Sequence, residues 1–133
     1  MNEGELFMEK AKEWFVKGDH DLQAVEILFT DPNPPTDTLC FHCQQAVEKY
    51  FKGFLTLNNI DFIKTHDLEY LLKLSHSSLK GIMDYEDEIL SLNKYSIESR
   101  YPADLPVYYP IDEARRAFEN AKELVKFIKN NIQ

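Results

Sequence analysis

The chain has 133 residues, of which 44% are hydrophobic and 29% charged, and its formal net charge is −8. This length and balance are typical of one globular domain, so we expect a single domain over residues 1–133. The negative charge argues against a protein that coats duplex nucleic acid through its overall charge, and any anionic ligand must meet a local cluster of the 15 Lys and Arg residues.

Nothing in the sequence predicts a membrane protein or a secreted one. The chain has no run near the roughly 20 apolar residues of a membrane span. Its first residues, MNEGELFMEK, lack the basic segment and the apolar run of a signal peptide. The two cysteines lie three residues apart in one helical pattern, which is typical of a protein with reduced thiols. We therefore expect a cytoplasmic protein.

The first half of the chain predicts two long helices. Apolar residues recur at spacings of four and three over residues 7–29, which is typical of a helix with one narrow apolar seam. Gly18 lies inside this seam and predicts the close approach of another helix. The segment DPNPP then ends the helix. We expect Asp37 or Thr38 to cap a second helix over about residues 38–58.

The second half predicts three more helices. We expect Thr65 to cap a short helix through HDLEYLLKLS, and a longer helix from about Ile82 to Ser99, ended by Pro102. The last helix has an apolar face made of Ala114, Ala117, Phe118, Ala121, Leu124, Val125 and Ile128. Because no segment alternates as a strand does, the predicted fold is all-α: an antiparallel up-and-down four-helix bundle with an additional short helix.

The second helix carries two stripes. Its core stripe is formed by Leu39, Cys43, Val47, Tyr50, Phe51, Phe54 and Leu57. A separate polar stripe, which we name the histidine–lysine strip, is formed by His42, Gln45, Lys49 and Lys52. The strip is either a solvated face whose lysines pair with nearby glutamates or a binding face for an anion, and the charge pattern alone leaves both interpretations open.

Cys40, His42 and Cys43 raise the question of a metal or redox site. A structural zinc site needs four ligands, and the sequence has no second Cys/His pair at suitable spacing. In a helix, His42 points about 100° away from Cys43, which belongs to the core stripe. A redox pair would need a strand context that is missing here. We therefore expect buried free thiols, no metal and no cofactor.

Three separated segments resemble one protein family. CFHCQQAVEKYFKGFL in the second predicted helix, KTHDLEYLL after it and then SRYP resemble the HEPN domain (higher eukaryotes and prokaryotes nucleotide-binding). The resemblance extends upstream to DHDLQAVEILF and covers about residues 11 to 130, and it is greatest to stand-alone prokaryotic members. It implies a helical bundle that dimerises and forms a shared groove.

The resemblance also implies partners. Many proteins of this kind form a complex with a minimal nucleotidyltransferase, often as a toxin–antitoxin pair, so a nucleotidyltransferase is an expected partner.

Phe41 projects from the polar side of the second predicted helix, away from the core stripe. We therefore expect Phe41 at the interface of a homodimer.

Active ribonucleases of this family carry an Arg followed, after four to six residues, by a His. Here Arg100 is followed by YPADLPVYYP, so that Leu105, Pro106 and Val107 occupy the positions of the motif's His, and no His follows Arg100. Arginine steadies phosphoryl oxygens but does not transfer protons at neutral pH. We therefore expect no catalytic residues and a protein that binds without cleaving.

The remaining candidates each have a structural and a functional interpretation. Arg100 either complements a helix C-terminus or contacts a phosphate with its planar fork, and we favour the phosphate. Tyr101 either packs against the helix end or stacks on a base. His66 either bonds to nearby backbone in a first helical turn or lies in the groove with His42.

Together these observations predict a HEPN-like dimeric binding protein for RNA or a nucleotide phosphate. Its predicted ligand-binding residues are His42, Gln45, Lys49, Lys52, His66, Arg100 and Tyr101. Two alternatives stay open. One is a metal-independent ribonuclease in which Arg100 acts with a substituted histidine, and the other is a purely structural interaction module in which the same residues form salt bridges.

Overall fold

The computed structural model describes residues 1–96 and 108–132, and all regular structure within them is helical. The elements are α1 (Glu3–Leu28), α2 (Thr36–Leu57), α3 (Leu68–Ser75), the 3₁₀ helix η1 (Ile82–Tyr85), α4 (Glu86–Asn93) and α5 (Ile111–Asn130). The predicted all-α bundle is confirmed. No helix within the described parts of the chain is both long enough and apolar enough to cross a membrane.

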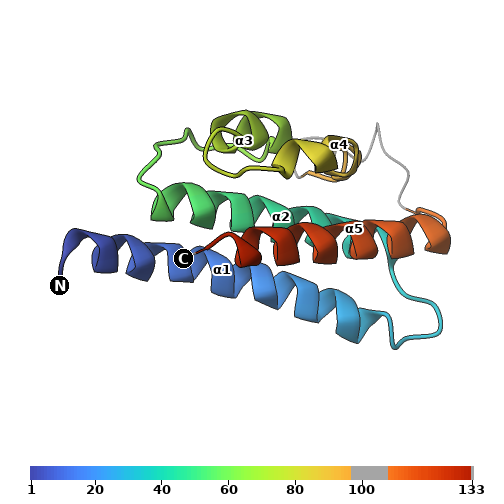
Figure 1. Ribbon diagram of the computed structural model, residues 1–133. Helices are drawn as coiled ribbons and strands as arrows, with labels where there is room; N and C mark the ends of the chain where they lie inside the picture. The colour runs from blue at the N-terminus through green and yellow to red at the C-terminus, as the bar shows by residue number, and fades with distance from the viewer. Residues whose placement is uncertain (97–107, 133) are drawn as a thin grey trace.

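Helix α2 is the centre of the bundle (Figure 1). It runs antiparallel to α1 on one side, α3 and α4 cover the opposite side, and α5 runs along it in the same direction. The six predicted core-stripe residues from Leu39 to Phe54 are buried, and Leu57 at the helix end is half-buried. A helix enclosed by four neighbouring helices has few open positions, so its polar side chains must find partners within the protein.

The contact between α1 and α2 depends on two glycines. A Cβ at Gly18 would lie 2.8 Å from Cδ2 of Tyr50 and 3.2 Å from the carbonyl oxygen of Ala46. A Cβ at Gly53 would collide with the ring of Phe15. The close helix approach predicted at Gly18 is therefore confirmed, and it brings the polar side chains of α1 within reach of α2.

Two predicted helix caps were wrong. Helix α2 begins at Thr36, directly after Pro35, because a proline at the start of a helix loses no intrahelical hydrogen bond. Helix α3 is capped by Asp67, whose side chain accepts from the backbone N–H of Glu69 at 3.0 Å. The hydroxyl of Thr65 instead accepts from the backbone N–H of Asp67.

The helix predicted from Ile82 to Ser99 is shorter than expected and is split into η1 and α4. Asn93, the last residue of α4, bonds to the start of α3: its side chain accepts from the N–H of Leu68 at 2.8 Å and donates to Asp67 at 2.9 Å. Two residues later the buried Tyr95 donates its hydroxyl to Glu113 of α5. These tertiary contacts end the helix, and local periodicity does not encode them.

Candidate anion-binding site

The histidine–lysine strip lies on α2, and two buried carboxylates bind its charged members. Asp21 of α1 binds His42 and Lys49 of the strip. Glu48 of α2 binds Lys52 of the strip and also His66. We name the two groups the Asp21 cluster (Asp21, His42, Lys49) and the Glu48 cluster (Gln44, Gln45, Glu48, Lys52, His66). Both follow the rule that buried charges are paired.

In the Asp21 cluster, one carboxylate from α1 joins two side chains of α2. Oδ1 of Asp21 lies 2.7 Å from Nδ1 of His42, and Oδ2 lies 2.6 Å from Nζ of Lys49. Asp21 is buried because it lies three residues after Gly18 and four before Val25, on the apolar seam of α1. Each carboxylate oxygen therefore has its own partner across the helix interface.

In the Glu48 cluster, one carboxylate meets a lysine, a histidine and two amides. Oε2 of Glu48 lies 3.0 Å from Nζ of Lys52, and Nδ1 of His66 lies 3.0 and 3.1 Å from the two oxygens. Gln44 and Gln45 donate to Oε1 at 3.2 and 3.3 Å. Five bonds to one buried carboxylate satisfy its charge and hold the imidazole in one orientation.

The same cluster fixes the segment between α2 and α3. Lys52 donates to the carbonyl oxygen of Thr65 at 2.6 Å, and Gln44 donates to that of His66 at 3.1 Å. The Nζ atom of Lys52 also lies 5.4 Å from the ring centroid of Trp14 on α1. His66 therefore reaches the strip because side chains of α2 bind the backbone on which it is carried.

The histidines and lysines of the two clusters differ in how far solvent reaches their side chains. The side chains of His42, Lys49 and His66 are 30%, 21% and 34% exposed, whereas that of Lys52 is 6% exposed. The first three side chains are partly open to solvent. Lys52 instead has two close acceptors inside the protein, so its direct contact with a ligand would require breaking them.

The net charge of the two clusters depends on their histidines. Asp21 and Glu48 offset the charges of Lys49 and Lys52, so the two clusters have no net charge while both imidazoles are neutral. Protonation of His42 and His66 would add a positive charge to each cluster.

Two predicted ligand residues, Arg100 and Tyr101, lie in residues 97–107, outside the described residues. Their placement beside the strip stays a prediction. The predicted interface residue Phe41 is half-buried on α2, and its ring centroid lies 5.3 Å from that of His42 in an edge-on arrangement. Any surface that Phe41 covers therefore adjoins the Asp21 cluster.

The thiols of α2 lie inside the core. Cys40 and Cys43 are buried and free, as predicted. Burial raises the pKa of Cys40 to about 11, and burial also raises the pKa of Cys43. These thiols are therefore protonated and poor nucleophiles. Within the described residues, no group of three or more His, Cys, Asp or Glu side chains is arranged to hold a metal ion.

Sequence reasoning missed Asp21, and it considered pairing of the strip's lysines with nearby glutamates without singling out Glu48 as a centre of the site. The sequence does place Asp21 on the apolar seam of the first helix, where a charged residue requires a partner. The identity of that partner depends on helix packing, which the sequence does not show. Glu48 had a local signal, since Glu48 and Lys52 are separated by four residues, the spacing of a helical ion pair.

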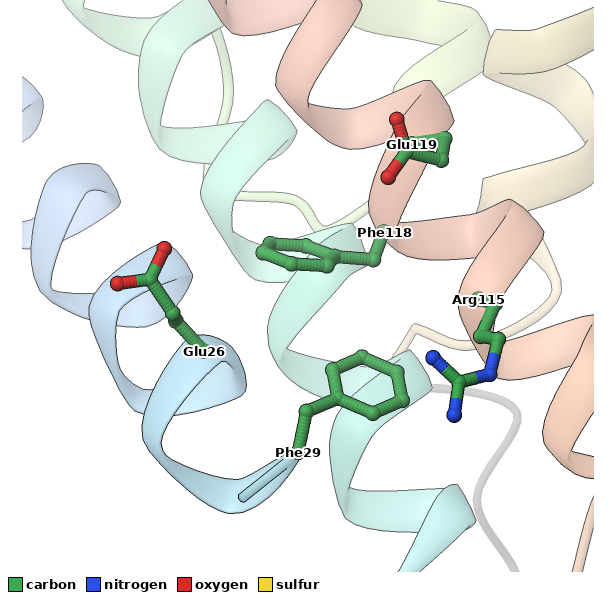
Figure 2. Close-up of a pocket in the computed structure, with 5 residues that line it drawn as sticks. All are labelled: Glu26, Phe29, Arg115, Phe118 and Glu119. Carbon is green, nitrogen blue, oxygen red and sulfur yellow. The ribbon is translucent and has the colours of Figure 1, made fainter.

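A separate pocket of about 360 Å³ lies between the end of α1 and the first half of α5. Its lining residues are Glu26, Phe29, Arg115, Phe118 and Glu119, and the guanidinium of Arg115 points toward the ring of Phe29 (Figure 2). The guanidinium carbon lies 5.4 Å from that ring centroid. The pocket shares no residue with the strip and mixes both signs of charge.

Comparison with known proteins supports the resemblance found in the sequence. The family model of the HEPN domain matches residues 11–131. A protein of Methanocaldococcus jannaschii named "Putative toxin MJ1304" is 26% identical over 131 residues, and the match covers 92% of this chain and 84% of that protein. No solved structure matches the chain.

Proposed function

The chain belongs to the HEPN domain family, and from this premise we propose that it is a non-catalytic binding protein for single-stranded RNA or a nucleotide phosphate. One observation carries the proposal: His42, Lys49 and His66 are gathered, partly exposed, beside the same helix. Imidazole and ammonium groups are donors suited to phosphate oxygens. The missing His after Arg100 supports binding without cleavage.

In this proposal His42, Lys49 and His66 contact the ligand, with Gln45 between them. Lys52 acts indirectly, because it holds Glu48 and the carbonyl group of Thr65 in place. Arg100 would add a bidentate phosphate contact, and Tyr101 would stack on a base. The ligand is single-stranded because a short strip on an acidic protein favours a flexible strand over a duplex.

The named toxin relative supports a biological setting of the toxin–antitoxin type. We propose that the protein belongs to such a pair, with a minimal nucleotidyltransferase as its partner, and that it acts as a homodimer. A two-fold axis would place two strips on one assembly and lengthen the cationic groove. Co-purification from the native host, followed by identification of bound protein and RNA, tests the partner.

The salt dependence of binding tests the ligand. We expect labelled single-stranded oligouridylate to bind at low salt, with log affinity falling by about 0.7 per neutralised phosphate per unit of log salt concentration. Lys49→Ala should flatten that slope because it removes a cation from the strip. Lys126→Ala, at an exposed lysine of α5, is the matched control and should leave the slope unchanged.

The second candidate function is a purely structural interaction module. It is favoured by the internal pairing of the strip, since the lysines of both clusters already have carboxylate partners. In that case oligouridylate does not bind at any salt concentration, while the protein partner still co-purifies. Equal slopes for Lys49→Ala and Lys126→Ala would instead show that RNA binds on another face.

A further inference from the structure

We propose that the Asp21 cluster is a proton-coupled subsite for one phosphodiester group, in which His42 takes up a proton as the phosphate binds. This inference rests on the proposed function and adds to it the chemistry of one contact. It uses three side chains whose geometry is fixed: Asp21 of α1, and His42 and Lys49 of α2.

The hydrogen bond to Asp21 determines what His42 presents to solvent. A carboxylate only accepts, so the 2.7 Å contact requires a hydrogen on Nδ1 of His42. A neutral imidazole with hydrogen on Nδ1 has a lone pair on Nε2. A phosphodiester oxygen is also only an acceptor, so the neutral ring repels it. Protonation of Nε2 turns this atom into a donor, and the proton comes from solvent while every bond of the RNA stays intact.

The charges around His42 lead to the same conclusion. Asp21 from α1 and Lys49 from α2 are the charged groups that meet its cluster, and their charges cancel. On α5, Lys122 affects the neighbouring thiol of Cys43 in the direction opposite to Asp21, and the charge of Lys122 is paired with that of Glu119 at 2.9 Å. The cluster is therefore neutral with a neutral imidazole and carries one positive charge with a protonated one. A phosphodiester, with one negative charge, matches the protonated form.

Lys49 supplies the second contact of the subsite. Its ammonium has three donors, and the 2.6 Å contact with Oδ2 of Asp21 uses one of them. Because His42 and Lys49 bind the two oxygens of one carboxylate, their solvent-facing donors are held near each other. The Glu48 cluster lacks this arrangement, since its lysine, Lys52, is buried and donates to both Glu48 and Thr65.

Calorimetry tests the inference directly. Oligouridylate is titrated into the full chain at one pH in buffers of different ionisation enthalpy, which measures the protons taken up. Its internal phosphodiesters do not titrate near neutral pH, so uptake reports on the protein. We expect uptake that approaches one proton per subsite, and an affinity that falls by up to about tenfold per pH unit above the range in which histidine titrates.

The variants separate His42 from the other histidines. His42→Gln retains an amide donor but takes up no proton, so we expect uptake to be lost and the pH dependence to flatten. His20→Gln, at an exposed histidine of α1, is the matched control and should behave as the wild type. His66→Gln should keep the uptake at the Asp21 cluster. In the wild type, the NMR titration midpoint of His42 should move to higher pH when oligouridylate is bound, and this readout needs no variant.

The outcomes separate the two proposals. Binding without proton uptake, uptake that persists in His42→Gln, or a His42 midpoint that does not move would each overturn the subsite and leave the proposed function standing. The absence of oligouridylate binding at every pH would overturn both.

Discussion

Gly18 of α1 lies directly against the ring of Tyr50 of α2, with space for no side chain between them. This contact sets the distance between the two helices three residues before Asp21, the residue of α1 that meets His42 and Lys49. The polar cluster at the surface therefore depends on a close apolar contact one turn away. Interiors are packed densely enough that such a contact transmits small displacements.

Gly18→Ala should destabilise the protein. The added Cβ would lie 2.8 Å from Tyr50 and 3.2 Å from the carbonyl oxygen of Ala46, and the backbone of α2 moves less easily than a flexible side chain. Overpacking of this kind costs about 1–3 kcal/mol, which exceeds the gain of at most about 1 kcal/mol in helix propensity. Urea denaturation measures the change in the free energy of unfolding.

Gly4→Ala is the control, because a Cβ there would meet only the side chain of Asn2 at 3.6 Å. We expect its unfolding free energy to stay the same or to rise slightly. A Gly18→Ala variant as stable as the wild type would show that α1 and α2 have room to separate.

Lys52→Met should also destabilise the protein, through charge. It removes the cation that pairs with the buried carboxylate of Glu48 and the donor to Thr65. Breaking one side of a buried ion pair costs about 3–5 kcal/mol, because the remaining charge stays buried. The matched control is Lys73→Met, whose exposed pair with Glu69 at 3.9 Å should contribute less than about 1 kcal/mol. Equal effects in the two variants would contradict a buried role for Lys52.

Phe41→Asp should weaken the predicted homodimer. Phe41 is half-buried beside His42, and a carboxylate at this position would have to lose its hydration in an apolar contact. Light scattering over a concentration series should show a dimer for the wild type and a shift toward monomer for the variant. A wild type that is monomeric at micromolar concentration would contradict the predicted dimer. An unchanged dimer in the variant would show that Phe41 does not lie at its interface.

The purified protein should not cleave RNA. Arg100 has no His at the spacing of the ribonuclease motif, and an arginine stays protonated at neutral pH because its pKa is above about 12. Incubation with single-stranded RNA, followed by gel analysis, measures cleavage. Activity that is lost in both Arg100→Ala and His66→Ala would establish the alternative, a ribonuclease with a substituted histidine.

The sequence predicted the parts of the fold that are governed by periodicity. The core stripe of α2 and the apolar face of α5 are buried as expected, with Leu57 and Phe118 at the edges half-buried. The fourth predicted helix was too long because Asn93 and Tyr95 form bonds to α3 and α5 that compete with helix continuation. Such bonds join residues far apart in the chain, so a local pattern does not contain them.

The candidate site was predicted in part. Residue spacing on α2 correctly grouped the members of the strip on one helix, but it treated Lys49 and Lys52 as equivalent. The structure separates them, since Lys49 is partly exposed and Lys52 is buried. The difference arises because Lys52 lies beneath the segment that carries Thr65 and His66, whose position is set by tertiary contacts.

Trp14 is the single tryptophan of the chain, and it lies 5.4 Å from Nζ of Lys52 and edge-on to Phe62. The protein thus contains one indole, which can be excited apart from its seven tyrosines and lies beside the Glu48 cluster. Indole emission is sensitive to nearby charge and to water, so it reports on this cluster without a label. Separation of the segment that carries Thr65 from α2 would change the emission of Trp14. This change can be measured in a mixture if its other components lack tryptophan.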